Sequence, residues 1–158
     1  MTAPRVTLDT NVLVYCVQAD DRRQRPALDL VELTIGGRCV LMLQSLGEFF
    51  VAATRKRCLT PNAAAGQVRR WLEVFPRPVP PSPPAVGAAI SAAAAGRFAY
   101  WDALLLATAA EAGCEAVISE DMAPGATLNG IRVVPAFSGD RVSPEALALL
   151  GDRPHASL

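Results

Sequence analysis

Histidine is almost absent from this sequence. Among 158 residues only His155 is a histidine, and it lies close to the end of the chain. We expect a side chain at that position to be frayed. Ser-His-Asp and Cys-His mechanisms are therefore disfavoured, because both need a positioned imidazole base. A zinc site built on histidine is equally poorly supplied.

Cysteine is scarce and scattered. The four cysteines have no CxxC spacing and form neither a zinc pattern nor a disulfide framework: Cys16, Cys39, Cys58 and Cys114. They predict buried, reduced thiols in a cytosolic protein. If this protein performs metal chemistry, its carboxylates must do it.

Net charge and long apolar runs are also lacking. Fifteen basic residues balance fifteen acidic ones, so a protein that coats DNA or a membrane surface is disfavoured. No segment reaches the roughly 18 uninterrupted apolar residues of a membrane span. Asp9 and Asn11 interrupt the apolar stretch near the N-terminus, so we expect no signal peptide. We expect a cytoplasmic protein with no membrane partner.

What the sequence does have is a regular alternation of apolar segments. Short apolar segments predict strands at Arg5–Asp9, Cys39–Leu43, Ala116–Ser119 and Ile131–Val134, and Cys39–Leu43 is an uninterrupted apolar run. Periodicity and capping residues predict helices at Thr10–Val17, Ala27–Ile35, Ser45–Lys56, Thr60–Phe75, Pro84–Gly96, Tyr100–Ala112 and Ser143–Leu150. The proline-rich segment Pro76–Pro84 predicts a stiff connection with room for a short edge strand around Val79.

This alternation predicts an α/β fold with a central parallel sheet and helices on both faces. Hydrophobic residues make up 51% of the chain, which is enough for one core. We expect a single domain over residues 1–158, with its core at about 4–137 and a short C-terminal helix at about 143–150.

Four carboxylates lie at the ends of the predicted elements. Asp9 ends the first strand, Glu48 lies near the start of a helix, Asp102 lies in the first turn of another, and Asp121 follows the strand Ala116–Ser119. Helices that follow strands begin at the carboxyl edge of a parallel sheet, where ligands collect. Three of the acids are therefore expected at that edge. Asp102 joins them only if its helix runs back in the right direction.

Converging carboxylates repel one another unless a cation lies between them. Mg²⁺ takes oxygen ligands and often uses only one or two protein carboxylates with substrate phosphate oxygens. Four acids suit one such ion, or two ions about 3.5–4 Å apart, as in many sites that cleave phosphodiesters. In that chemistry a metal-bound water is the nucleophile and no histidine is required.

Four short motifs carry a family resemblance. LDTNVL at Leu8–Leu13 resembles the first motif of PIN-domain ribonucleases, LGEFF at Leu46–Phe50 the second, and WDALLLA at Trp101–Ala107 the third. SEDM at Ser119–Met122 resembles the fourth, which is often a Thr/Ser-x-Asp triplet. Order and spacing match over most of the chain, and the pattern is most similar to VapC-type toxins of toxin–antitoxin pairs.

The resemblance implies a PIN-like three-layer α/β/α fold and a Mg²⁺- or Mn²⁺-dependent endoribonuclease. It makes four acids catalytic and metal-binding, and two polar residues supporting: Asp9, Glu48, Asp102 and Asp121, with Asn11 and Ser119. Glu120 is ambiguous because neighbouring residues at a strand end point opposite ways, and we favour Asp121 as the site acid. The resemblance also implies an RNA substrate, a cognate antitoxin and a homodimer.

Simpler interpretations stand beside these. Asp9 and Asp102, taken singly, are also explained as acids at helix N-termini, but capping does not explain four motifs in order. Trp101 could stack an RNA base, although we favour packing for it. Phe49 and Phe50 are expected in a core or an interface.

Basic side chains are candidates for contacts to RNA phosphates. They form three groups: Arg22/Arg23/Arg25, Arg55/Lys56/Arg57 and Arg69/Arg70. The alternative is a solvated helix face, which we favour for the third group. The first group lies in a loop near Asp9 and is the predicted substrate contact, although two aspartates beside it weaken the case.

Two other functions remain open. A catalytically silent PIN-like module would bind RNA or protein without cutting, but all four acids are present. A phosphatase of the haloacid-dehalogenase type also places an Asp after its first strand. That mechanism needs a second Asp two residues later and a suitably placed lysine. The position holds Asn11 and the only lysine is Lys56, which disfavours it.

Overall fold

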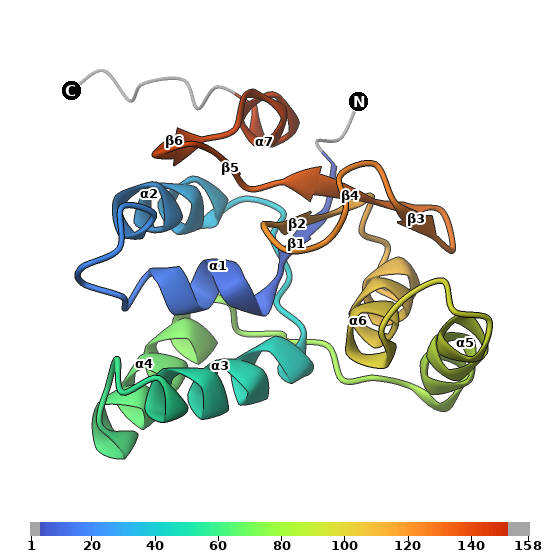
Figure 1. Ribbon diagram of the computed structural model, residues 1–158, viewed down its shortest axis with the longest axis horizontal. Helices are drawn as coiled ribbons and strands as arrows, with labels where there is room; N and C mark the ends of the chain where they lie inside the picture. The colour runs from blue at the N-terminus through green and yellow to red at the C-terminus, as the bar shows by residue number, and fades with distance from the viewer. Residues whose placement is uncertain (1–3, 152–158) are drawn as a thin grey trace.

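A four-stranded sheet runs through the middle of the molecule in the order β1-β2-β4-β3 (Figure 1). The structure, a computed structural model, describes residues 4–151, so the expectation for His155 lies outside the described residues. Strands β1 (Val6–Leu8), β2 (Ala116–Ser119) and β4 (Ile131–Pro135) are parallel. The edge strand β3 (Thr127–Leu128) is antiparallel to β4. The predicted parallel sheet is confirmed, with one antiparallel edge that sequence reasoning missed.

Helices cover both faces of this sheet, which confirms the three-layer α/β/α architecture (Figure 1). One side carries α1 (Thr10–Tyr15), α2 (Gln24–Thr34), α3 (Leu43–Arg55) and α4 (Pro61–Val74). The other side carries α5 (Pro83–Ala94) and α6 (Tyr100–Glu111). A short hairpin of β5 (Phe137–Ser138) and β6 (Arg141–Val142), also missed, leads to α7 (Pro144–Leu150).

Alternation along the strands divides the apolar residues between two cores. Leu8 and Ile118 face the core shared with α1 to α4. Val117 and Val133 face the core shared with α5 and α6. Successive strand residues point to opposite faces, so a strand covered on both faces is apolar at most of its positions. This explains why β2 reads as an unbroken apolar run.

The strand predicted at Cys39–Leu43 is wrong. The segment makes only isolated bridges, from Cys39 to Val6 and from Met42 to Val79, and α3 already begins at Leu43. Leu41 and Met42 are fully buried. Their apolar character therefore reflects burial and not membership of the sheet, a distinction that an apolar run alone cannot make.

Capping residues marked several helix starts correctly. The side chains of Thr60 and Ser143 accept hydrogen bonds from the backbone N–H groups of Ala63 and Ala146 at the starts of α4 and α7. All four cysteines are free, but only Cys16 and Cys114 are buried, so the expectation of burial is wrong for the other two. Within residues 4–151, every helix is too short or too polar to cross a membrane.

Candidate active site

The register of the sheet brings Asp9 and Ser119 together. Leu8 pairs with Ile118 across β1 and β2, and the backbone N–H of Asp9 donates to the carbonyl oxygen of Ile118 at 2.9 Å. Asp9 and Ser119 thus leave the carboxyl edge of the sheet side by side. The hydroxyl of Ser119 donates a hydrogen bond to Asp9 Oδ2 at 2.7 Å.

The Asp9 carboxylate is fixed from several sides. Its Oδ1 accepts from the backbone N–H of Thr10 at 2.7 Å, so Asp9 is also the N-cap of α1. Asn11 Nδ2 donates to Asp9 Oδ2 at 3.2 Å. The side chain therefore serves as a cap and faces the site, and the two interpretations of Asp9 do not exclude each other.

Burial and neighbouring negative charge raise the pKa values of two acids at this edge, Asp9 and Asp102. Burial raises the pKa of Asp9 from 3.8 to about 6, against the lowering effect of the hydrogen bonds from Ser119 and Thr10. The charges of Asp102 and Asp121 raise it further. The pKa of Asp102 is also raised, first by burial and then by the charge of Asp121. Such a group of carboxylates favours a cation.

Glu48 approaches Asp9 through Thr10. The Thr10 hydroxyl donates to Glu48 Oε2 at 3.4 Å, and Gln44 Nε2 donates to Glu48 Oε1 at 2.6 Å. Gln44 Nε2 also lies 2.8 Å from the carbonyl oxygen of Trp101, to which it donates. The start of α3 is thereby tied to α1 and to the start of α6.

The direction of α6, left open by the sequence, places Asp102 at the same edge. The helix ends at Glu111, and β2 begins at Ala116 after a short turn, with α6 packed against the sheet. The helix therefore runs against the direction of β2. Its N-terminus, with Asp102 in the first turn, lies at the carboxyl edge of the strands.

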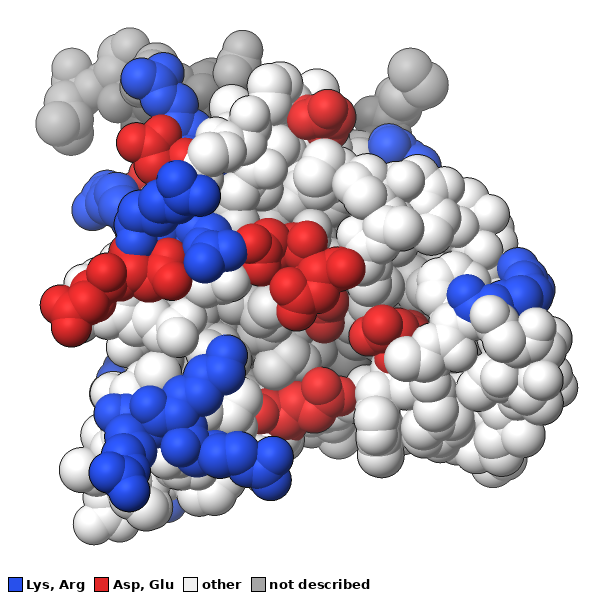
Figure 2. All heavy atoms as spheres, viewed as in Figure 1, with Lys and Arg blue, Asp and Glu red and all other residues white. Residues whose placement is uncertain are grey.

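A cleft of about 320 Å³ collects all four predicted acids, together with Asn11. Figure 2 shows acidic side chains gathered in the middle of one face, with basic groups on one side of them. The acids surround the cleft without converging on one point. Within residues 4–151, no three Asp, Glu, His or Cys side chains form a ready metal-binding group. The donors are oxygen atoms, and Mg²⁺ binds through one or two carboxylates while keeping several waters, so the donor set fits such an ion.

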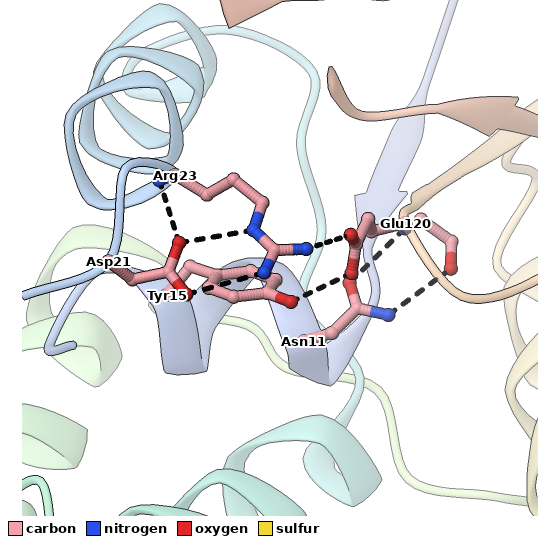
Figure 3. A network of polar contacts seen from close by, with 6 residues as sticks. Asn11, Tyr15, Asp21, Arg23 and Glu120 are labelled. Atoms are coloured by element: carbon pink, nitrogen blue, oxygen red, sulfur yellow. Dashed lines mark hydrogen bonds and ion pairs between the residues drawn. The ribbon is translucent and has the colours of Figure 1, made fainter. Parts of the chain in front are cut away.

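Glu120 and Asp121 point to different surroundings. Glu120 accepts a hydrogen bond from the Tyr15 hydroxyl at 2.9 Å and pairs with Arg23 (Figure 3). Its backbone N–H donates to Asn11 Oδ1 at 3.3 Å. Asp121 lines the cleft. This placement supports the choice of Asp121 over Glu120, and the catalytic roles themselves stay predictions.

The predicted substrate arginines lie outside the acid cleft. Arg23 pairs with Asp21 at 3.1 Å and with Glu120, and its guanidinium lies 4.3 Å from the centre of the Tyr15 ring. Arg25 pairs with Asp29 at 2.8 Å. A third arginine, Arg22, is exposed. Contacts from these arginines to RNA stay a prediction, and Arg23 already has partners within the protein.

Some expectations for aromatic residues were wrong. Trp101 is 60% exposed and is not a packing residue. Phe49 is buried as expected, whereas Phe50 next to it is 37% exposed, so that for Phe50 only the interface part of the expectation stays open, as a prediction. Apolar character alone does not determine burial, and Trp101, in the first turn of α6, is an example.

Sequence reasoning also missed residues that line or brace the cleft: Thr10, Tyr15, Gln18 and Gln44. Lys56, one of the basic candidates from the sequence, lines the cleft as well. The spacing of residues along α3 was a signal in the sequence for Gln44 and Lys56. Residues four apart share a helix face, and this spacing links Gln44, Glu48, Ala52 and Lys56 along α3.

Comparison with known proteins places the chain in a family. Residues 6–123, more than half of the chain, match the model of the PIN domain. No curated protein matches the sequence significantly. Among solved structures, VapC20 of Mycobacterium tuberculosis, described as a toxin that cleaves the sarcin-ricin loop, matches with a TM-score of 0.60 and 20% identity, over 73% of this chain and 89% of that one. VapBC2 of Rickettsia felis, bound to a DNA fragment from its promoter, matches with a TM-score of 0.59 and 11% identity, over 82% and 97% of the two chains.

Proposed function

Because the chain belongs to the PIN domain family, we propose that it is an endoribonuclease that uses Mg²⁺ or Mn²⁺ and acts as the toxin of a toxin–antitoxin pair. The observation that carries the proposal is the meeting of Asp9, Glu48, Asp102 and Asp121 at one cleft. Four segments far apart in the sequence supply these acids. Helix capping explains single members of the set, but it does not bring all four to one cleft.

Each acid has a role that follows from its position. Asp9, which is buried, supplies carboxylate oxygen atoms that accept hydrogen bonds from Ser119 and Asn11. Asp102 and Asp121 lie close enough to Asp9 for their charges to raise its pKa, so we assign them to the same cation. Glu48, oriented by Gln44 and Thr10, completes the set from α3.

When bound, a divalent cation supplies Lewis acidity that activates water and neutralises charge on the scissile phosphate. Side chains of the protein orient the carboxylates that would bind this cation. Asn11 and Ser119 keep Asp9 in one orientation, and the Asp9 pKa of about 6 leaves the carboxylate mostly ionised at neutral pH. The acids alone would repel RNA phosphates, so RNA binding and cation binding are coupled.

Partners follow from the same proposal. The similarity to VapBC2 supports a cognate antitoxin, and an arginine entering the acid cleft is a physically reasonable inhibitor. A homodimer through α3 and α4 is proposed because Phe50, Leu72 and Val74 on these helices are partly exposed.

The decisive test is cleavage of a mixed pool of labelled RNAs by the purified protein. Fragments should form with Mn²⁺ or Mg²⁺, disappear in EDTA and be absent with Asp9→Asn. Asp140→Asn, a change of an exposed acid in the β5–β6 hairpin, is the matched control and should cleave normally. Full activity in EDTA would contradict the metal mechanism. Folded protein that binds Mn²⁺ but cuts no RNA would favour the silent binding module.

A further inference from the structure

A second hollow opens beside the acid cleft. It has a volume of about 480 Å³ and lies between α3 and Trp101 at the start of α6. Three residues line both this groove and the acid cleft: Glu48, Ala52 and Lys56. The groove is therefore continuous with the cleft, and a chain bound at the acids passes directly beside it.

The walls of this groove, which we call the Trp101 groove, combine apolar and cationic groups. Val51 is 49% exposed and Trp101 is 60% exposed, whereas Arg55 and Lys56 bring positive charge. The Trp101 ring has an edge contact with Tyr100, at 4.9 Å between centroids. An exposed aromatic ring beside cations suits a nucleotide, because bases stack on aromatic rings and phosphates contact cations.

Lys56 lies where three hollows meet. It lines the acid cleft, the Trp101 groove and a third hollow of about 430 Å³ that Arg57 also borders. Figure 2 shows a group of basic side chains next to the acidic middle of this face. The third hollow also holds Asp20 and Asp21, whereas the Trp101 groove has two cations, Arg55 and Lys56, and one acid, Glu48, which it shares with the cleft. The Trp101 groove is therefore the hollow beside the acids that better suits a neighbouring phosphate.

We propose that the Trp101 groove is a subsite for one unstacked nucleobase of single-stranded RNA, next to the phosphate held at the acid cleft. The inference rests on the proposed function, since it requires RNA in that cleft. A polynucleotide is favoured over a peptide because it presents a base and a phosphate at the same time. In this subsite Trp101 stacks on the base, and the two cations, Arg55 and Lys56, contact the phosphate.

The test measures binding without cleavage, in full-length Asp9→Asn protein with Mg²⁺. The probes are a labelled pool of random-sequence RNA decamers and an abasic decamer with the same sugar-phosphate backbone. Trp101→Ala should weaken binding of the RNA pool about 5- to 100-fold and leave binding of the abasic probe nearly unchanged. Trp101→Phe should restore most of the affinity because a phenyl ring still stacks.

Tryptophan emission gives an independent readout. Trp71 is 5% exposed and packs against Phe49, so quenching by a ligand at the surface reports on Trp101. The RNA pool should quench the emission more strongly than the abasic probe. Ile90→Ala is the matched control, because Ile90 is 55% exposed on α5 and lines neither hollow.

Each contrary outcome has a definite meaning. If Trp101→Ala in the Asp9→Asn background binds RNA as tightly as Asp9→Asn alone, the subsite proposal is overturned. The nuclease proposal then still stands, provided that the wild-type protein cleaves RNA. Absence of both RNA binding and cleavage overturns the nuclease proposal and the subsite with it. Quenching by an acidic peptide but not by RNA overturns the subsite in favour of a protein-docking surface.

Discussion

Ser119 donates a hydrogen bond to Asp9 across 2.7 Å, although 110 positions separate the two residues. The pairing of β1 with β2 creates this contact. The bond stabilises the ionised carboxylate and so opposes the effect of burial on its pKa. Ser119 therefore adjusts the charge of Asp9 as well as its orientation.

Replacing Ser119 by alanine should raise the pKa of Asp9 further above its value of about 6. Loss of one hydrogen bond to a charged group corresponds to about 1 pH unit. Protons compete with Mn²⁺ for the carboxylate, so the pH below which Mn²⁺ binding fails should move upward, as measured by titration calorimetry at several pH values. Ser119→Thr keeps the hydroxyl and should behave like wild type. If Mn²⁺ binding by Ser119→Ala fails at the same pH as in wild type, this role for Ser119 is contradicted.

Asp9 should destabilise the metal-free protein at neutral pH. Its folded pKa of about 6 lies above the ordinary value of 3.8 for an aspartate, so its contribution to stability is fully present below about pH 4 and is lost as the pH rises through 6. The loss amounts to about 3 kcal/mol. Asp9→Asn removes this penalty but disturbs the bond from Asn11, which leaves a gain of about 1–2 kcal/mol.

Urea unfolding of metal-free protein at pH 7.5 and at pH 4.5 tests this expectation. Asp9→Asn should be more stable than wild type at pH 7.5, and the difference should shrink at pH 4.5. Asp140→Asn is the control, because Asp140 is an exposed acid in the β5–β6 hairpin, away from the cleft, and its replacement should leave the stability nearly unchanged at both pH values. A metal-free Asp9→Asn protein that is less stable than wild type at pH 7.5 would argue against unneutralised charge at the site.

The positions of these acids could be predicted from the sequence to a limited depth. Asp9 and Asp121 follow apolar strands, and parallel strands end at one edge. The contacts of Glu120 with Tyr15 and Arg23 could not be predicted, because they depend on how the loop after α1 folds back toward β2. A contact between segments so far apart in the chain leaves no pattern in the local sequence.

The failed strand at Cys39–Leu43 has a similar cause. Leu41 and Met42 are buried between the sheet and the helices, and an apolar run signals burial alone. Short elements such as β3 and the β5–β6 hairpin were missed because two residues give no periodicity. Long helices with capping residues, such as α4, were predicted well since their signals are local.

Glu120 and Asp121 should differ sharply on substitution. Asp121→Asn should weaken Mn²⁺ binding and lower cleavage by about 100-fold or more, since the carboxylate lines the cleft. Glu120→Gln should lower cleavage by less than about tenfold and cost about 1 kcal/mol or less, because the pair with Arg23 is partly exposed. Calorimetry with Mn²⁺ and a cleavage assay measure both variants. The opposite ranking would make Glu120 the site acid.

Lys56, the only lysine in the chain, should contribute to RNA affinity through phosphate contact. A single-stranded nucleic acid releases counterions when cations bind its phosphates, and the slope of log K against log salt is about −0.7 for each contact. Lys56→Gln should therefore reduce the magnitude of this slope by about 0.7, measured with the random RNA decamers and the Asp9→Asn protein in Mg²⁺.

Arg97→Gln removes an exposed charge that lines none of the three hollows and should leave the slope unchanged. Arg23→Gln should change the slope less than Lys56→Gln, because Arg23 is already paired with Asp21 and Glu120. If Arg23→Gln reduced the slope and Lys56→Gln did not, the RNA would run along the loop before α2 and not along the end of α3.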